Sequence, residues 1–464
     1  MTHSAMRLYA LPIILMTILL SACVGQAPLS NSAAPASPEE AASPEAAPIT
    51  VLMSNAPEEN NPDEVARFQQ LVADFAKLRP DVRIEALQGA WFKETFVARL
   101  AAGTMEDTFL VPVTEPQDLI AKGYVADITD QLKEWEHFDS FNPAVLDLVN
   151  DHNDRLYGIP VSGFSQGLIY NRKLFAEAGL DPDQPPATWE ELRAYARQLT
   201  DRDEGRAGFV VLSKGNQGGW QFTAWAYSFG GDLLQRQGDA WVATFTDEPV
   251  VQALETIRAM RWEDQILTEQ HLLEVKDVLP LLATERVAMA ILAPDALRSL
   301  KSQYEANIED FGFGPLPQAG GNATYTGGAV WMFNPKSDPQ VLQAAVEWTL
   351  FRDFNLQTFE ADLKAQQERG QLVGWPQLPL FVGEFQQQRD AIIAKYANAP
   401  VEHCQPYLQA NLQLRTAPPV EAQQMFAMLD TALQAILTDV GAEPRAELEK
   451  AAQQFQRQVL DQVQ

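Results

Sequence analysis

One short motif in the chain has the form of a catalytic serine turn. Gly163-Phe164-Ser165-Gln166-Gly167 matches the Gly-x-Ser-x-Gly spacing of a hydrolase nucleophile, and His271 and His403 lie downstream, where a general base would follow. Such a serine needs a strand before it and a helix directly after it, because its oxyanion donors come from the helix start. Leu168-Ile169-Tyr170 is instead an apolar run typical of a strand. The sequence therefore disfavours a secreted hydrolase, which is kept only as a minor alternative.

No other pattern in the sequence points to catalysis or to a cofactor. Glycoside hydrolysis requires two facing carboxylates, and although the chain has 62 acidic residues, no motif singles out a pair. There is no P-loop and no Gly-x-Gly-x-x-Gly after a predicted strand, so nucleotide chemistry has no support. The histidines are scattered, and Cys404 has only His403 beside it, so no spacing fits a metal site. We therefore predict no catalytic residue, no metal and no cofactor.

The elements that must position any functional side chains alternate between strands and helices. Residues 49–53 form a predicted strand, Asn61-Pro62-Asp63-Glu64 has the cap, proline and glutamate of a helix start, and residues 82–86 alternate as a second strand. Strand, helix and strand in this order form a right-handed unit with parallel strands. Thr188-Trp189-Glu190-Glu191 is a capping box that opens a helix to about Leu199. Further predicted elements are helices at 92–102, 116–122, 248–262 and from 443 onward, and a strand at 108–113. The pattern indicates an α/β fold with helices on both sheet faces.

The first 48 residues have the pattern of an export signal and a tether. Arg7 supplies a positive charge, residues 8–20 are apolar apart from Thr17, and Leu20-Ser21-Ala22-Cys23 follows at once. The tetrapeptide resembles a bacterial lipobox, which implies a signal peptide at 1–22 and acylation of Cys23; a plain secretory signal or a short membrane anchor is the alternative. Residues 23–48 consist largely of Ala, Pro, Ser and Glu, so we expect a disordered tether. These features predict a protein held by lipid on the extracytoplasmic face of the cell membrane.

Composition limits the partners of the body of the protein. A net charge of −28 argues against binding to nucleic acid or to an anionic membrane surface. Cys404 is the only cysteine after Cys23, so no intramolecular disulfide can form, and we expect a buried, inert thiol. The body, about 415 residues long, is too large for one ordinary core and implies about two domains.

Several segments together resemble the bacterial extracellular solute-binding proteins of sugar importers, of the maltose-binding type. The most telling are Leu156–Val161, Leu168–Phe175, Ala178–Leu180 and Pro186–Leu192, and the supporting ones are Lys122–Ile128, Phe229–Leu233, Val287–Ile291, Gly312–Pro317 and Gly327-Gly328. The likeness spans nearly all of the chain from Ile49 onward, in the right order and spacing.

This resemblance implies two α/β lobes with a hinge and an interlobe cleft, the periplasmic-binding-protein fold of class II type. It places crossings between the lobes near residues 162–167, 288–292 and about Lys336. The expected first lobe is then 49–161 with 290–335, and the expected second lobe is 162–289 with 336–464. In the family the lobes close over the ligand by hinge bending.

Candidate binding residues follow the predicted strands of the first lobe. Asn55 and Glu58 lie in the loop after the first strand, and Thr114 and Glu115 follow the third. Open α/β sheets bind ligands at the carboxyl ends of their strands, although each residue alone is more often a solvated loop residue. Trp91, after the second strand, suits either stacking on a ligand or plugging the lobe.

Aromatic side chains are the other candidates, because flat rings stack on the C–H faces of sugars. Trp220 lies ten residues before Gly230-Gly231, where family members often carry a stacking aromatic, and packing is its alternative role. Phe164 falls at the expected hinge, Tyr325 precedes two glycines, and Trp375 lies where the family often supplies another aromatic. Trp225 and Trp331 are expected in the core.

One departure from the family pattern leaves the ligand class open. After residues 290–292, sugar-binding relatives often have a glycine and an aromatic, whereas this chain has Ala293-Pro294-Asp295, and Asp295 suits a hydroxyl or an amine. We predict a monomeric binding protein that passes a mono- or oligosaccharide to an ABC permease. A non-sugar solute, glycerol-phosphate-like or amine-bearing, is the alternative, and the few basic residues in the cleft loops weigh against a phosphate.

Overall fold

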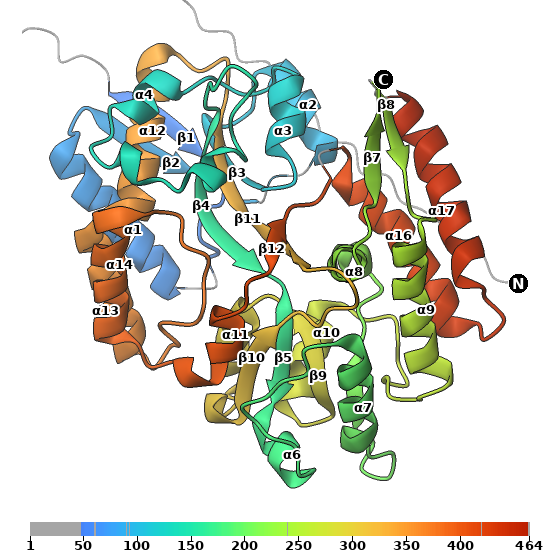
Figure 1. Cartoon of the computed structure of the whole chain (residues 1–464). Coiled ribbons are helices and arrows are strands. Elements are labelled where there is room, and N and C mark those ends of the chain that lie inside the picture. The colour runs from blue at the N-terminus through green and yellow to red at the C-terminus, as the bar shows by residue number, and fades with distance from the viewer. Residues whose placement is uncertain are drawn as a thin grey trace, which may run out of the picture. The chain divides into compact units, whose positions relative to one another are not determined.

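The computed structural model describes residues 48–59, 62–89, 91, 93–238, 240–418 and 420–462. Pro48–Gln464 forms one compact unit (Figure 1). The predicted signal peptide at 1–22, the predicted lipid site Cys23 and the tether up to residue 47 lie outside the described residues, as does the predicted helix cap Asn61. No helix within the described ranges is long and apolar enough to cross a bilayer.

Six strands form the sheet of the first lobe. They are β1 (Ile49–Met53), β2 (Val82–Ala86), β3 (Thr108–Pro112), β4 (Gly158–Ser165), β11 (Ala323–Phe333) and β12 (Gln413–Arg415). The order is β12-β11-β3-β1-β2, and β4 also pairs with β11. Strand β1 runs parallel to β2 and β3, which confirms the predicted strand, helix and strand unit, whereas β11 runs antiparallel to β3 and β4.

The second lobe contains a four-stranded sheet and a separate hairpin. The sheet has the order β10-β5-β9-β6, from β5 (Gly167–Asn171), β6 (Ala207–Val210), β9 (Val287–Leu292) and β10 (Phe311–Pro315). The hairpin pairs β7 (Leu234–Gln237) with β8 (Ala240–Ala243). All residues of β5, β6 and β9 are buried, so these strands read as continuous apolar runs in the sequence.

Helices cover the first sheet and share its core. They are α1 (Pro62–Leu78), α2 (Lys93–Ala102), α3 (Pro116–Ala121), α4 (Thr129–Lys133), α5 (Pro143–Leu146), α12 (Pro339–Phe354), α13 (Leu356–Glu368) and α14 (Gly383–Tyr396). Trp348 of α12 is fully buried between Phe68 and Phe75 of α1, at centroid distances of 6.0 and 5.3 Å. The apolar spacing that predicted α1 therefore marks the face that packs against α12.

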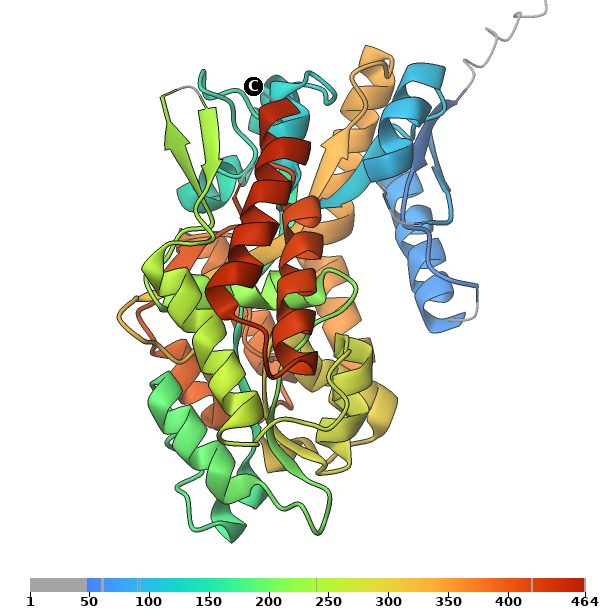
Figure 2. The same ribbon diagram turned by 90° about the vertical axis from the view of Figure 1, so that its right-hand side faces the viewer.

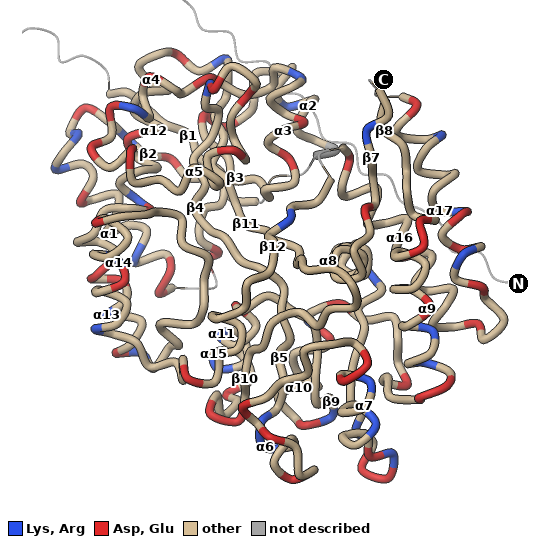
Figure 3. Tube along the Cα trace, in the orientation of Figure 1, with Lys and Arg blue, Asp and Glu red and all other residues tan. Residues whose placement is uncertain are grey.

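The helices of the second lobe are α6 (Arg172–Glu177), α7 (Trp189–Leu199), α8 (Gln217–Ser228), α9 (Glu248–Trp262), α10 (Val275–Ala283), α11 (Asp295–Tyr304), α15 (Gln405–Leu408), α16 (Ala422–Thr438) and α17 (Pro444–Gln458). Short 3-10 turns occur at Phe138–Ser140, Ile308–Asp310, Val401–Cys404 and Leu460–Gln462. Helix α7 begins with both hydrogen bonds of the predicted capping box, between Thr188 and Glu191. Figure 2 shows α16 and α17 side by side, and Figure 3 shows Lys, Arg, Asp and Glu mainly on helices and loops.

The structure differs from the expected lobes at two of the three crossings. The first crossing lies at residues 165–167, within the expected 162–167 and four residues beyond the expected lobe boundary, because β4 stays paired with β11 as far as Ser165 and β5 begins at Gly167. Strands β9 and β10 both pair with β5, so residues 290–315 belong to the second lobe, and the chain returns between β10 and β11. Helix α12 packs into the core of the first lobe, so no crossing occurs at Lys336. The sequence of a buried apolar strand does not indicate which sheet the strand joins, which explains these errors.

Helix α8 approaches α16 so closely that one contact point requires a glycine. A Cβ added to Gly219 would lie 2.2 Å from the carbonyl oxygen of Phe426. We expect Gly219→Ala to lower the free energy of unfolding by about 1–3 kcal/mol, because the two backbones must separate. Gly441→Ala, whose Cβ would lie no closer than 3.3 Å to Asp439 Oδ1, is the control for denaturant unfolding. Equal stability of the two variants would contradict the expectation.

Candidate functional site

The predicted serine motif forms a hinge strand and not a catalytic turn. Ser165 ends β4, and β5 begins at Gly167, so a second strand follows where a nucleophile turn would have a helix. The Ser165 Oγ lies 2.6 Å from the Tyr407 Oη. Because the serine sits in extended backbone between the two sheets, its environment is that of a connection between lobes.

Three of the predicted residues meet at this connection and form what we call the hinge aromatic cluster: Phe164, Trp220 and Tyr325. The Trp220 ring lies edge-on to Phe164 and to Tyr325, at centroid distances of 6.3 and 6.1 Å. Phe164 lies over Gly327 of β11, where a Cβ would be only 2.4 Å from its Cζ. Tyr325 is buried, whereas Phe164 and Trp220 are half-buried. The cluster thus brings β4, α8 and β11 together at the point where the chain passes between lobes.

Helix α8 is held in place by side chains of Asp430 and Gln166 and by its own Gln221. The buried Asp430 of α16 accepts hydrogen bonds from the backbone N–H groups of Asn216 and Gly219, at 2.8 and 2.7 Å. The Gln166 side-chain amide donates to the carbonyl oxygen of Trp220 at 3.3 Å, and Gln221 Nε2 donates to that of Ile291 at 2.8 Å. A carboxylate at a helix N-terminus satisfies otherwise unpaired N–H groups, so Asp430 fixes the turn that carries Trp220.

Thr114 and Glu115 lie close to the same cluster. Both are buried directly after β3, and the Thr114 hydroxyl donates to Glu115 Oε1 at 3.1 Å. Burial raises the pKa of Tyr325 well above its usual range; the Glu115 carboxylate adds to this rise, and the hydrogen bond with Trp220 opposes it. The phenol of Tyr325 therefore stays neutral and serves as a hydrogen-bonding group.

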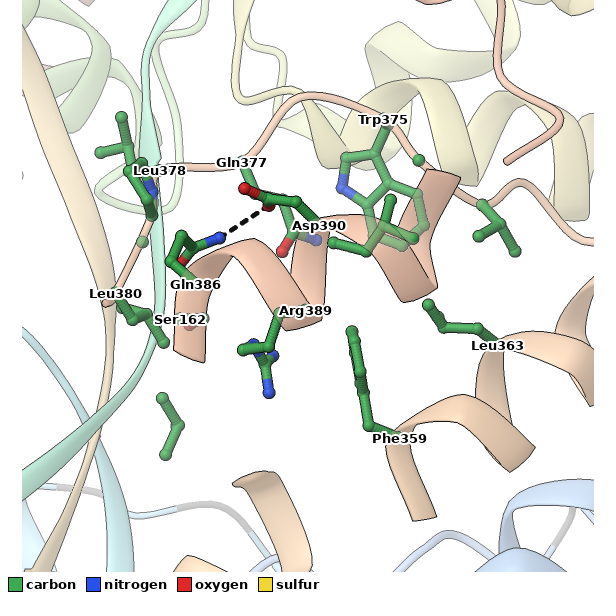
Figure 4. Close-up of a pocket in the computed structure, with 16 residues that line it drawn as sticks. Ser162, Phe359, Leu363, Trp375, Gln377, Leu378, Leu380, Gln386, Arg389 and Asp390 are labelled. Carbon is green, nitrogen blue, oxygen red and sulfur yellow. Dashed lines mark hydrogen bonds between the residues drawn. The ribbon is translucent and has the colours of Figure 1, made fainter. Parts of the chain in front are cut away.

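Trp375 lines a cavity that is separate from the hinge aromatic cluster, and we call it the hinge cavity. This cavity of about 370 Å³ is lined by residues of β4, α13, the segment 373–380 and α14 (Figure 4). Trp375 is half-buried, and the guanidinium carbon of Arg298 in α11 lies 5.2 Å from its ring centroid. Because Trp375 packs against the core of the second lobe while β4 and α14 belong to the first, the cavity lies beside the connection between the lobes.

A second cavity, of about 310 Å³, lies between helices of both lobes. Its lining comes from α1 and α13 of the first lobe and α11 of the second, together with Gln371. Arg67 and Asp362 form an ion pair across it at 2.7 Å. Asp295 is exposed at the start of α11, one turn before Arg298. The helix that carries Asp295 thus faces the first lobe across a polar space.

The remaining predicted residues lie apart from the hinge aromatic cluster. Asn55 is half-buried with a φ of +59°, and its N–H donates to the carbonyl of Gly89 at 3.3 Å. Glu58 is exposed. Trp91 is half-buried against Phe96, at a centroid distance of 5.7 Å, which fits the plugging role. Trp225 and Trp331 are buried, as predicted for core residues.

Sequence reasoning missed the residues that line the hinge cavity besides Trp375. Arg389, Phe359 and Gln377 come from helix α14, helix α13 and the segment between them, and no motif marks them. Arg298 was missed as well, although it follows Asp295 by three residues. Only the glycine and proline around Trp375 pointed to this part of the chain.

The described parts of the chain contain no metal site and no reactive thiol. There, no group of three His, Cys, Asp or Glu residues is placed to hold a metal ion. Cys404 is buried and free, as predicted, and burial raises the pKa of its thiol to about 12. Since the thiolate is the reactive form, this cysteine is inert near neutral pH.

Comparison with curated proteins finds distant relatives that are described as binding proteins. A binding protein of Brucella abortus (strain 2308) is 23% identical over 268 residues, which cover 56% of this chain and 62% of the relative. The sn-glycerol-3-phosphate-binding periplasmic protein UgpB of Yersinia pestis (bv. Antiqua, strain Antiqua) is 29% identical over 177 residues, covering 35% of this chain and 38% of the relative. The chain thus spans less than two thirds of the length of these relatives.

Solved structures of low sequence identity share the fold over most of the chain. Maltose-bound MalE3 of T. maritima has a TM-score of 0.69 at 20% identity and covers 88% of this chain and 99% of its own. An ABC transporter solute-binding protein of Thermotoga lettingae bound with α-D-tagatose has a TM-score of 0.66 at 20% identity, covering 88% and 98%. UgpB of Mycobacterium tuberculosis in complex with glycerophosphocholine has a TM-score of 0.66 at 18% identity, also covering 88% and 98%.

A family model describes the chain more directly. The model of the bacterial extracellular solute-binding proteins matches residues 59–350, which is more than half of the sequence. It covers the strands and helices that meet at the hinge, and this family consists of binding proteins and not of enzymes. The chain therefore belongs to the bacterial extracellular solute-binding protein family and has its two-lobed α/β fold.

Proposed function

We propose that this protein captures a small polar solute, in the first instance a carbohydrate, between its two lobes and delivers it to the permease of an ABC importer. The observation that carries the proposal is the hinge aromatic cluster, where Phe164, Trp220 and Tyr325 meet at the crossing between the two sheets. A ligand that contacts both lobes there is bound best in the closed form, so binding shifts the population toward closure.

The chemistry around the hinge suits a hydroxylated ligand. The half-buried rings of Phe164 and Trp220 offer stacking surfaces, and the neutral phenol of Tyr325 offers a hydrogen-bonding group. Selectivity would follow from burial, because a ligand hydroxyl left unpaired in a closed site costs about 1–3 kcal/mol. Solved proteins of this fold that carry maltose or tagatose support the sugar class.

A thermal-shift screen of the full chain tests the function. Mono- and oligosaccharides, polyols, glycerol phosphates, polyamines and amino acids are added in turn, because a ligand that binds only the folded state raises the melting temperature. We expect a dose-dependent rise with one class of small hydroxylated solutes and no turnover of the bound compound. If no class of solute raised the melting temperature, the proposal would be contradicted.

Trp220→Ala is expected to weaken solute binding by about tenfold or more, because stacking on an aromatic ring is lost. Isothermal titration with the solute found in the screen measures the change. Trp220→Phe is the control, since it keeps a ring against Phe164 and Tyr325, and we expect it to retain most of the affinity. Near-native affinity of the alanine variant would remove Trp220 from the site.

We also propose that the protein is anchored by lipid at Cys23 on the extracytoplasmic face of the membrane. The lipobox-like Leu20-Ser21-Ala22-Cys23 supports this proposal. Cells that express the full chain should incorporate labelled palmitate into it, and Cys23→Ser should abolish labelling and release the protein from the membrane fraction. Cys404→Ser is the control and should leave labelling unchanged; labelling that survives in Cys23→Ser would contradict the anchor.

A further inference from the structure

Arg389 carries a guanidinium that has no acidic partner. It extends from α14 into the hinge cavity, between Ser162 and Phe359 (Figure 4). Its guanidinium carbon lies 4.1 Å from the ring centroid of Phe359, 5.6 Å from that of Phe381 and 5.8 Å from that of Phe354. Within the described ranges it forms no ion pair, and its Nη1 is buried without a hydrogen-bond partner. A buried cationic group without an acceptor costs free energy, so an anionic group that reached this guanidinium would be favourable.

Two carboxylates influence this guanidinium without pairing with it. Asp390, which also lines the cavity, accepts a hydrogen bond from Gln386 at 2.7 Å. Asp353 accepts one from the Trp331 indole at 3.0 Å. Burial lowers the pKa of Arg389 to about 10, and both carboxylates oppose that change. The group is therefore cationic at neutral pH, and neither carboxylate forms an ion pair with it.

The remaining lining of the hinge cavity suits a small hydroxylated molecule. Its volume of about 370 Å³ lies in the range of about 300–1,000 Å³ that holds small ligands. Trp375 supplies an aromatic ring and Gln377 a side-chain amide. Ser162 Oγ accepts a hydrogen bond from the N–H of Ala329 at 3.1 Å, which leaves its own hydroxyl proton available as a donor.

We propose that the hinge cavity binds a small hydroxylated anion, with Arg389 pairing with its carboxylate or phosphate group. The planar guanidinium fork matches both groups in geometry, and a charge-assisted pair is favoured where water is excluded. This inference goes beyond the proposed solute-binding function, because the hinge cavity is separate from the hinge aromatic cluster, and it assigns the cavity to sugar acids or to phosphorylated sugars and polyols. The strand-end loops have few basic residues, but Arg389 lies on a helix that the sequence did not mark.

Matched pairs of neutral and acidic solutes test the inference on the full chain. Isothermal titration compares galactose with galacturonate and glycerol with glycerol 3-phosphate, and inorganic phosphate is titrated alone. We expect binding of at least one acidic member and weaker or no binding of its neutral counterpart. Binding of galacturonate but not of glycerol 3-phosphate would show that the cavity takes a carboxylate. Binding of glycerol 3-phosphate but not of galacturonate would show that it takes a phosphate.

Variants of α14 show whether Arg389 is the group responsible. Arg389→Gln should weaken binding of the acidic solute by about tenfold or more, and Arg389→Lys, which keeps the charge but not the fork, should retain part of the affinity. Lys395→Gln is the matched control, because Lys395 lies on the same helix and pairs with Glu360 at 2.6 Å instead. Circular dichroism of each variant verifies that the fold is retained.

Two results would overturn the assignment. Acidic solutes that bind equally well to wild type and Arg389→Gln would show that another group holds the anion. Wild-type protein that binds only the neutral members would exclude the anion subsite and leave solute capture intact. Binding of no solute in this panel or in the thermal-shift screen would instead overturn the proposed function itself, and the subsite with it.

Discussion

Trp225→Ala is expected to lower the free energy of unfolding by about 3–5 kcal/mol, the usual cost of removing a large aromatic side chain from a packed core. Trp225 is fully buried and stacks on Trp189 with ring centroids 3.4 Å apart and an angle of 16° between the planes. Phe209 lies edge-on to it at 6.1 Å. Substitution leaves a cavity between α7, α8 and β6 that these neighbours cannot fill.

Denaturant unfolding followed by circular dichroism measures this loss, and two variants serve as controls. Trp225→Phe keeps a ring in the stack and should cost clearly less than the alanine variant. Trp220→Ala, five residues away on the same helix but half-buried, should lose less stability and more solute affinity. Equal stability losses for Trp220→Ala and Trp225→Ala would contradict the distinction between a binding and a core tryptophan.

Asp430→Ala is expected to lower the free energy of unfolding by about 3 kcal/mol and to weaken solute binding as well. The substitution removes the acceptor of two backbone N–H groups, those of Asn216 and Gly219, in a buried place. Each buried donor left without a partner costs about 1–3 kcal/mol. Because the same turn carries Trp220, the variant should also shift that ring, and isothermal titration would detect the effect on affinity.

Asp430→Asn separates the charge of this side chain from its shape. Its amide keeps one acceptor oxygen but presents an N–H₂ group to a backbone donor, so an intermediate loss of stability is expected. Burial raises the pKa of Asp430 above its ordinary value of 3.8, although its backbone hydrogen bonds act in the opposite direction.

Because of this raised pKa, the difference in stability between wild type and Asp430→Asn should depend on pH. The folded state holds the proton more tightly than the unfolded state, so the stabilising contribution is full below about pH 4 and is lost as the pH rises through the folded-state pKa. The stability gap between wild type and Asp430→Asn should therefore narrow as the pH rises above about 4. A constant gap would mean that Asp430 does not titrate in this way.

Local elements were largely predictable, because capping and periodicity are properties of neighbouring residues. Helix α9 has the bounds that its Glu248-Pro249 start predicted, and α7 opens with the predicted capping box. The expected core role of Trp225 and the hinge position of Phe164 also hold. The order of the family segments was enough to predict the fold class and the family.

The candidate site was only partly predictable. Trp220, Phe164 and Tyr325 were named separately, and only the structure shows that their rings touch. Thr114 and Glu115 join them because β3 pairs with β11. Asp430 and Arg389 carried no signal, since one caps a helix more than 200 residues earlier in the chain and the other lies on a helix without a motif.

The sequence by itself determined several of the strands and helices, the absence of a catalytic serine turn at Ser165 and membership of a solute-binding family, because each of these depends on short-range spacing or on segment order. Tertiary structure alone decided which sheet β9 and β10 join, that α12 to α14 belong to the first lobe, and which side chains meet at the hinge. Strand pairing and burial depend on contacts between distant segments, and a buried apolar strand looks the same in the sequence whichever sheet receives it.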